Sequence, residues 1–198
     1  MAGTIASLLS IALGIGLAAA TGFRIFVPLL FAGIAARAGW LPLNESFAWL
    51  ESTAALLVLG TAAIAETLAY YIPGVDHVLD VIAGPAAVVA GIVASAAAMT
   101  DVAPALMWPL AIIAGGGIAG VTKSGSALVR AKTGVATAGL GNPVVSTAET
   151  AGATTLSILA IAVPFLCLVL VAFLLFWSIR RIARFIRARS PTDAGSLD

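Results

Sequence analysis

One segment sets the architecture of this chain, Gly14-Ile15-Gly16-Leu17-Ala18-Ala19-Ala20-Thr21-Gly22-Phe23-Arg24, which runs on to Pro28. The segment is apolar enough for a lipid bilayer, yet it contains glycines, a cation and a proline, the residue that interrupts helices. An arginine at membrane depth costs about 2.5–3.5 kcal/mol on insertion scales, so it normally faces a protein interior or a water-filled cavity. We therefore expect a broken membrane helix here. A related segment, Gly115-Gly116-Gly117-Ile118-Ala119-Gly120-Val121-Thr122-Lys123, also ends at a cation.

The composition identifies an integral membrane protein. Of the 198 residues, 61% are hydrophobic and only 10% are charged, and the mean hydropathy is +1.12. A soluble domain carries roughly 25% charged residues. The formal net charge of +1 excludes little, because its distribution is uneven: half of the ten cations lie near the C-terminus, at Arg180, Arg181, Arg184, Arg187 and Arg189.

Hydrophobic runs predict the membrane segments. Full spans are expected at residues 4–21, 47–72, 76–99 (with an early interruption at Gly84-Pro85), 104–120 and 154–177, since a spanning helix needs about 20 residues. Residues 23–38 form either a short span or a re-entrant half-helix. Residues 121–140 carry three cations, so we expect them to be covered by protein or water rather than lipid. Pro164 is a candidate kink in the last span.

The two glycine-rich segments indicate an internal duplication. Placing Gly14 on Gly115 also matches Thr21 with Thr122, and after a three-residue slip Asn44 falls on Asn142 and Glu51 on Glu149. If the cation-bearing segments of both halves are re-entrant, five spans and two half-helices result and the repeats are inverted. If both segments cross, there are seven spans and the repeats are parallel. The cations in 121–140 favour the inverted arrangement.

The predicted fold is therefore an all-α polytopic membrane protein of two repeats, each with a broken or re-entrant helix. Residues 1–100 hold the first repeat and a linking helix, and residues 101–179 hold the second. Residues 180–198 form a basic amphipathic tail, which is expected to lie on the cytoplasmic side against anionic lipid headgroups. Gly116 and Gly120 form a GxxxG pair, for which close helix packing is the default and a homo-oligomer the alternative.

The deepest cations are the first candidates for a binding site. Arg24 either binds an anion, such as a carboxylate or a lipid phosphate, or forms an ion pair with Glu51 or Glu66. Lys123 occupies the corresponding place in the second half, and it either shares an anion site with Arg24 or lies at the membrane interface. Arg130 is a secondary candidate that, with Lys132, is expected at the interface or in solvent.

The acidic candidates are Glu51, Glu66 and Glu149. Glu51 and Glu149 match across the proposed repeat and are expected to pair with Arg24, Lys123 or Arg130. Glu66 lies deeper in its segment and is a candidate proton or cation site. The secondary candidates are Asp76, which we expect to cap a helix, Asp80, which we expect on a hydrated face, and the turn residues Asn44 and Asn142.

The sequence lacks the motifs of several functional classes. His77 is the only histidine and has no partners at ligand spacing, so no metal site or cofactor is expected. The sequence has no nucleophile motif and no phosphate-cradling loop, so we do not expect an enzyme. No basic surface for nucleic acid is indicated either.

Two groups of residues carry a family resemblance. They are Glu66…Ile72-Pro73-Gly74-Val75-Asp76 and Lys123-Ser124-Gly125…Asn142-Pro143…Ser146…Glu149. Over roughly residues 9–173 the chain resembles a bacterial membrane family known as domain of unknown function 4126. The resemblance marks six positions, Glu66, Pro73, Asp76, Pro85, Lys123 and Glu149, and implies no established activity.

The chain departs from the pattern of that family at three places. Tyr70 and Tyr71 stand where relatives often carry an Asp-Lys pair, Gly84 replaces an arginine, and Thr150 replaces a second acid. These changes weigh against a charge relay.

The sequence thus predicts a small transporter or channel-like carrier for an anionic solute, in the cytoplasmic (inner) membrane of a bacterium. Its site would lie between the repeats, lined by Arg24, Glu51, Glu66, Lys123 and Glu149. One alternative is a lipid-phosphate binder or flippase that uses the same cations. Another is a scaffold or assembly factor that works through its basic tail without transporting anything.

Overall fold

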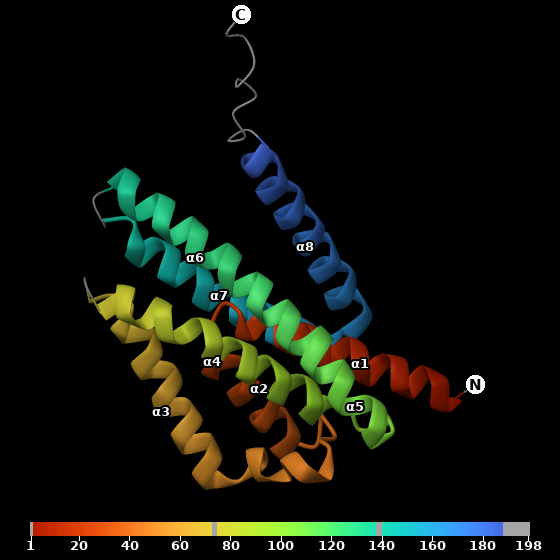
Figure 1. The fold of residues 1–198 in the computed structure, drawn as a ribbon. Helices are drawn as coiled ribbons and strands as arrows, with labels where there is room; N and C mark the ends of the chain where they lie inside the picture. Colours follow the sequence, from red (N-terminus) through yellow and green to blue (C-terminus); the bar gives the residue numbers. More distant parts are fainter. Residues whose placement is uncertain (1, 73–74, 138–139, 188–198) are drawn as a thin grey trace, which may run out of the picture.

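In the computed structural model, residues 2–72, 75–137 and 140–187 are described, apart from the side chains of residues 2, 76, 77, 177–179 and 181–187. This part of the chain is helical, without strands (Figure 1). Its elements are the α-helices α1 (Ala2–Thr21), α2 (Phe26–Arg37), α3 (Thr53–Ala69), α4 (Val75–Ala98), α5 (Pro104–Leu110), α6 (Gly117–Thr137), α7 (Asn142–Ala162) and α8 (Pro164–Arg187), the 3-10 helix η1 (Glu45–Glu51) and the π-helix η2 (Ala111–Gly116).

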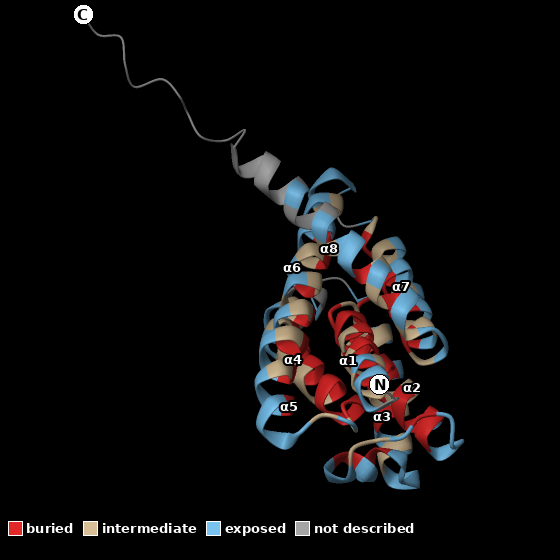
Figure 2. Ribbon diagram, turned by 90° about the vertical axis from the view of Figure 1, so that its right-hand side faces the viewer, coloured by how far each residue is buried: buried red, intermediate tan, exposed pale blue. Residues whose placement is uncertain are grey.

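Helix α1 lies at the centre of the molecule. It packs against α2, α4, α6, α7 and α8, and Figure 2 shows its buried turns between these neighbours. Its inner residues are mostly small: Ala12, Ala18 and Ala20 have no exposed surface. Small side chains let helix backbones approach closely, which is the main way that helices pack in a membrane. The Ala- and Gly-rich sequence of α1 therefore makes it the core of the bundle.

The predicted break in the first half is present. α1 ends at Thr21, the chain turns over the next four residues, and α2 begins at Phe26. With 12 residues, α2 is about 18 Å long at 1.5 Å per residue, which is shorter than the roughly 30 Å hydrocarbon core. α2 leads the chain back towards the N-terminal end of α1. In the segment that follows α2, the Asn44 backbone N–H donates to the Ala97 carbonyl.

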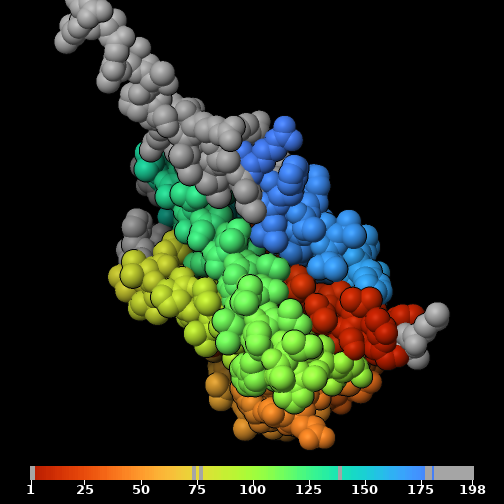
Figure 3. All heavy atoms as spheres, turned by 45° about the vertical axis from the view of Figure 1, so that its right-hand side comes forward, coloured from red at the N-terminus to blue at the C-terminus, as the bar shows by residue number. Residues whose placement is uncertain are grey.

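The predicted break in the second half is wrong. α5, η2 and α6 form one continuous helical rod of 34 residues from Pro104 to Thr137, which runs between α4 on one side and α1 and α8 on the other (Figure 3). The glycines of η2 allow close packing against α4 and do not reverse the direction of the chain. A Cβ on Gly115 would lie 2.8 Å from the Gly91 carbonyl oxygen of α4. Residues 121–137 of the segment expected to be re-entrant are thus part of this rod.

Two further segment boundaries differ from the prediction. The expected span at 47–72 consists of η1 and α3, which meet at 68°, because Ser52 is extended and its Oγ accepts the Ala55 N–H to cap α3. The expected span at 154–177 is divided between α7 and α8, since Val163 leaves the helical conformation and Pro164 starts α8. In contrast, α4 continues through Pro85.

The structure confirms an all-α fold over the described residues, with several helices that could cross a membrane. Four helices are long and apolar enough to span, or five if η1 and α3 are taken as one bent span, and residues 26–37 and 164–176 form shorter apolar helices. The exact number of spans and the duplication stay predictions. In the basic tail, Arg180 is exposed on α8 and lies over the Phe176 ring. The other four tail arginines have side chains outside the described residues.

Gly22, directly after α1, permits a close approach of the chain to α6. A Cβ at this position would lie 2.4 Å from the Thr122 Cβ and 2.7 Å from the Ala119 carbonyl oxygen. Both contacts are far shorter than a side chain tolerates, so the two helices can meet here only at a glycine. The same contact sets the position of the following turn, and hence of Arg24, relative to Lys123.

We predict that Gly22→Ala destabilises the protein by about 1–3 kcal/mol, the usual cost of overpacking. The measurement is the free energy of unfolding in bicelles, titrated with SDS. Gly125→Ala on α6 is the matched control, because a Cβ there meets no atom within 4 Å. Equal stabilities for the two variants would contradict this packing.

Candidate functional site, a buried polar cluster

Six charged side chains from the α1–α2 turn and four helices gather around one tyrosine, Tyr70, at the end of α3. We call them, together with Tyr70, the polar cluster: Arg24, Glu66, Asp80, Lys123, Arg130 and Glu149. Three cations and three carboxylates cancel in formal charge. Five of the six charged residues are buried, and Asp80 is partly exposed.

Helical periodicity aligns the contributions of α6 and α7. Lys123, Ser126 and Arg130 are three and four residues apart, so they share the buried face of α6. Ser146, Glu149 and Ala153 have the same spacing on the buried face of α7. These two faces meet each other and the α1–α2 turn.

Arg24 holds the turn against α7. Its side chain is fully buried, its Nε donates to the Thr150 hydroxyl at 3.0 Å, and its Nη2 donates to the Ser146 carbonyl at 2.9 Å. The same Nη2 reaches the Ser146 hydroxyl at 2.5 Å and lies 3.7 Å from Glu149 Oε2. Arg24 thus pairs with Glu149 on α7, one of the partners predicted for it, and not with Glu51 or Glu66.

Glu149 is shared between two arginines. Its Oε2 accepts a hydrogen bond from Arg130 Nη2 and lies near Arg24 Nη2, while its Oε1 accepts from the Ser126 hydroxyl. Removing one partner of a buried ion pair costs far more than an exposed pair contributes, because the other charge is left uncompensated. Glu149 thus joins the α1–α2 turn, α6 and α7.

The Tyr70 ring lies close to all three cations of the polar cluster. The guanidinium carbons of Arg24 and Arg130 lie 4.5 and 4.0 Å from the ring centroid, and Lys123 Nζ lies 5.3 Å from it. All three distances are within the range of cation–π attraction. The Tyr70 hydroxyl accepts from Lys123 Nζ at 3.0 Å and donates to Asp80 Oδ1 at 3.2 Å.

Asp80 is the carboxylate partner of Lys123 and Arg130. Its Oδ1 accepts from Lys123 Nζ at 3.1 Å, and its Oδ2 lies 3.5 Å from Arg130 Nε. Asp80, expected on a hydrated face, is partly exposed and has two cation partners. The interfacial or solvated position expected for Arg130 is wrong, because Arg130 is buried. Both residues belong to the ion-paired interior.

Glu66 accepts hydrogen bonds from the backbone at the start of α2. Its Oε1 accepts the Ile25 N–H at 3.0 Å and its Oε2 accepts the Phe26 N–H at 3.3 Å. These are donors that the start of α2 leaves without intrahelical partners, and a carboxylate there also meets the positive end of the helix dipole. Glu66 thus caps α2 from α3 and fixes the turn that carries Arg24.

Two guanidinium donors of the polar cluster are unmatched. Arg24 Nη1 and Arg130 Nη1 are buried and have no hydrogen-bond acceptor among the described residues. Arg130 Nε also lacks a hydrogen bond, but it lies 3.5 Å from its ion-pair partner Asp80 Oδ2. A buried donor without an acceptor costs about 1–3 kcal/mol, and more when it is charged. The arrangement therefore offers two directed donors to an additional acceptor, and an anion suits them best.

Exposed apolar residues lie beside the polar cluster on three of its helices. Leu68 on α3, Val81 and Ile82 on α4 and Val129 on α6 are all exposed and apolar. Such a surround is expected in hydrocarbon and not in water. Charges surrounded by such residues are tolerated only if they are enclosed and paired, as they are in the polar cluster.

The other predicted site residues lie elsewhere. Glu51 is exposed at the end of η1, and Asn44 precedes η1, where its side chain accepts the Ser46 N–H. Asn142 is buried at the start of α7. The pairs matched between the halves thus occupy unlike environments. The side chain of Asp76 lies outside the described residues. Within the described chain, no three His, Cys, Asp or Glu side chains group as metal ligands.

The sequence interpretation missed four residues of the site, Tyr70, Ser126, Ser146 and Thr150. The serines had a usable signal, since each lies three or four residues from a buried charge on the same helix face. Tyr70 and Thr150 are positions at which the chain departs from the family pattern, and both contact Arg24.

We predict a graded response to substitution of Tyr70. Tyr70→Phe keeps the ring but loses the hydroxyl between Lys123 and Asp80, which costs about 1–3 kcal/mol. Tyr70→Leu also loses the cation–π contacts and should cost a further 0.5–2 kcal/mol or so. The free energy of unfolding in bicelles measures both effects, with Tyr71→Phe as the control. If Phe and Leu have the same effect, the ring does not support the cations.

Comparison with known proteins places the chain in a family. No curated protein and no solved structure matches it. Residues 11–184 match the family described as "Domain of unknown function (DUF4126)", which covers the whole polar cluster and all but the ends of the chain. The polar cluster therefore belongs to a member of this family, domain of unknown function 4126.

Proposed function

We propose that this protein is a membrane carrier for a small anionic solute, which binds at the polar cluster. The observation that supports the proposal best is the pair of buried, unmatched donors, Arg24 Nη1 and Arg130 Nη1. Both guanidinium groups lie over the same Tyr70 ring and approach the same oxygen of Glu149, so the two donors belong to one small region. An anion between them would replace part of what Glu149 now supplies.

Competition for the arginines provides a transport step. The polar cluster is neutral, so an entering anion adds a charge that must displace a carboxylate from its partners. Glu149 is on α7 and its strongest partner, Arg130, is on α6. A change of partner would therefore loosen the contact between α6 and α7 and favour a different arrangement of these helices. A ligand shifts such an equilibrium by its difference in affinity for the two states.

A lipid-phosphate binder or flippase is the second candidate, and one observation favours it. An apolar groove of about 340 Å³ between α2 and α3 is lined by Val27, Leu30, Gly60, Ala63, Ile64, Thr67 and Leu68. It runs along the same helix that ends in Glu66 and Tyr70. An acyl chain fits such a groove, which would bring a phosphate towards the cations from the lipid side.

The proposed setting is the inner membrane of a bacterium, with the C-terminus in the cytoplasm. The five tail arginines support this orientation, because cytoplasmic flanks of membrane segments are enriched in Arg and Lys. Two related halves with the site between them also stay part of the proposal. A scaffold that works through the tail would instead leave the polar cluster without a ligand.

The test is anion flux into proteoliposomes, with acetate, sulfate and inorganic phosphate as probes. Arg24→Lys keeps the charge but lacks the planar fork of donors, so we expect the flux of the accepted anion to fall about tenfold or more. Lys132→Gln, at an exposed cation on α6, should have the flux of the wild type. Equal thermal stability of the three proteins shows that folding is not the cause.

Native mass spectrometry of the same proteins separates the alternatives. A phospholipid that the wild type retains and Arg24→Lys loses, without flux of the probes, would favour the lipid-phosphate candidate. If no probe moves and the wild type and Arg24→Lys carry the same adducts, both the carrier and the lipid-phosphate proposals are wrong.

A further inference from the structure

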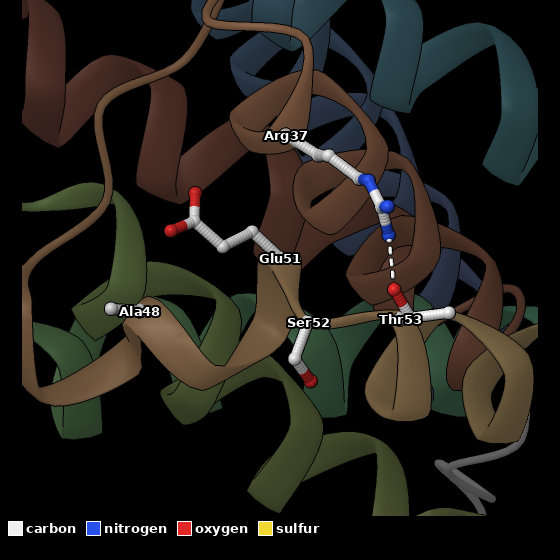
Figure 4. Close-up of a pocket in the computed structure, with 5 residues that line it drawn as sticks. All are labelled: Arg37, Ala48, Glu51, Ser52 and Thr53. Atoms are coloured by element: carbon white, nitrogen blue, oxygen red, sulfur yellow. Dashed lines mark hydrogen bonds between the residues drawn. The ribbon is translucent and has the colours of Figure 1, made fainter.

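A second charged site lies at the opposite end of α2 and α3 from the polar cluster. There the end of α2, η1 and the start of α3 enclose a polar hollow of about 480 Å³ (Figure 4). We call it the interfacial hollow; its lining residues are Arg37, Ala48, Glu51, Ser52 and Thr53. It has no part in the proposed transport of an anion.

Two opposite charges line the interfacial hollow without pairing. Arg37 Nη1 donates to the Thr53 hydroxyl at 2.8 Å, which holds the guanidinium in place and uses one of its five donors. The Glu51 carboxylate is turned away from Arg37 and forms no hydrogen bond or ion pair with the described residues (Figure 4). The hollow thus presents a fixed cation and a carboxylate with open acceptor oxygens, side by side but separate.

The surroundings place this hollow at headgroup depth. Trp40 and Trp49, which flank it in the chain, are 77% and 54% exposed, and tryptophans with exposed rings are enriched at the membrane–water interface. Further along α3 the exposed residues are mostly apolar, beginning with Leu57 and Val58, and the one exposed polar side chain, Thr61, donates to backbone carbonyls of its own helix. The hydrocarbon therefore begins one turn beyond the hollow, and phospholipid headgroups lie level with Arg37 and Glu51.

We infer that the interfacial hollow binds a zwitterionic phospholipid headgroup that ends in a primary ammonium, as in phosphatidylethanolamine. The phosphate accepts hydrogen bonds from Arg37, and the ammonium donates to Glu51. A choline headgroup has no N–H to donate to the carboxylate, and phosphatidylglycerol has no cation at all. Glu51 is thus the residue that determines headgroup specificity, and Arg37 provides affinity for any phospholipid.

The experiment is lipid titration of the delipidated full-length protein, followed by native mass spectrometry, with phosphatidylethanolamine, phosphatidylcholine and phosphatidylglycerol of identical acyl chains. We expect the wild type to prefer phosphatidylethanolamine over phosphatidylcholine by up to about fivefold, the range of an exposed ion pair. Glu51→Gln should abolish this preference, and Arg37→Gln should weaken binding of all three lipids. Both side chains are exposed, so neither variant threatens folding.

Glu45→Gln is the matched control, because Glu45 is an exposed acid on the same 3-10 helix but does not line the hollow. A preference that survives Glu51→Gln, or that Glu45→Gln removes equally well, overturns the inference. Equal binding of the three lipids by the wild type also overturns it. Soluble glycerophosphoethanolamine should compete poorly, because it lacks the acyl chains; if it binds as tightly as the lipid, the ligand is a soluble phosphoester.

Discussion

The structure depends on the sharing of one carboxylate, Glu149, between two buried arginines. An isolated charge at membrane depth is costly, and the cost falls only when a counter-charge is held nearby. Arg24 comes from the α1–α2 turn, Arg130 from α6 and Glu149 from α7, so meeting this requirement fixes three separate parts of the chain relative to one another. The remaining features of the bundle can be understood as what brings these groups within reach.

Three local features bring Arg24, Arg130 and Glu149 within reach of one another. Gly22 lets α1 approach α6, which sets the place of the turn. Glu66 caps the first backbone donors of α2 and holds the turn open towards α7. Tyr70 offers its ring to three cations and its hydroxyl to Lys123 and Asp80. A neutral aromatic ring stabilises cations without taking the place of an anion, so it leaves donors of Arg24 and Arg130 available to a ligand. This is the physical basis of the proposed carrier.

Much of this arrangement could be predicted from the sequence. The excess of apolar residues predicts a helical membrane protein, and Gly22 followed by Arg24 predicts the turn and its inward-facing cation. Lys123, Glu66 and Glu149 were candidates because charges are rare in such segments. The second glycine cluster was misread, since a glycine may end a helix or admit a neighbouring helix, and only the presence of α4 beside Gly115 shows which occurs.

The sequence alone also could not identify ion-pair partners that lie far apart in the chain. Arg130 and Asp80 were assigned to water because their counter-charges lie on other helices, far away in the chain. Glu51 matched Glu149 in a sequence comparison, yet Ser52 bends the chain and leaves Glu51 at the surface. Polar residues spaced by three and four positions around a charge, such as Ser126 and Ser146, are a signal that sequence reasoning can use.

The most direct test of the central claim is a double-mutant cycle between Arg130 and Glu149. The free energies of unfolding of Arg130→Met, Glu149→Gln and the double variant are measured in bicelles against the wild type. A buried pair predicts a coupling energy of about 1–3 kcal/mol, with the double variant more stable than the sum of the single losses implies. Strictly additive losses would show that the two side chains do not meet, and would contradict the structure on which the proposed site rests.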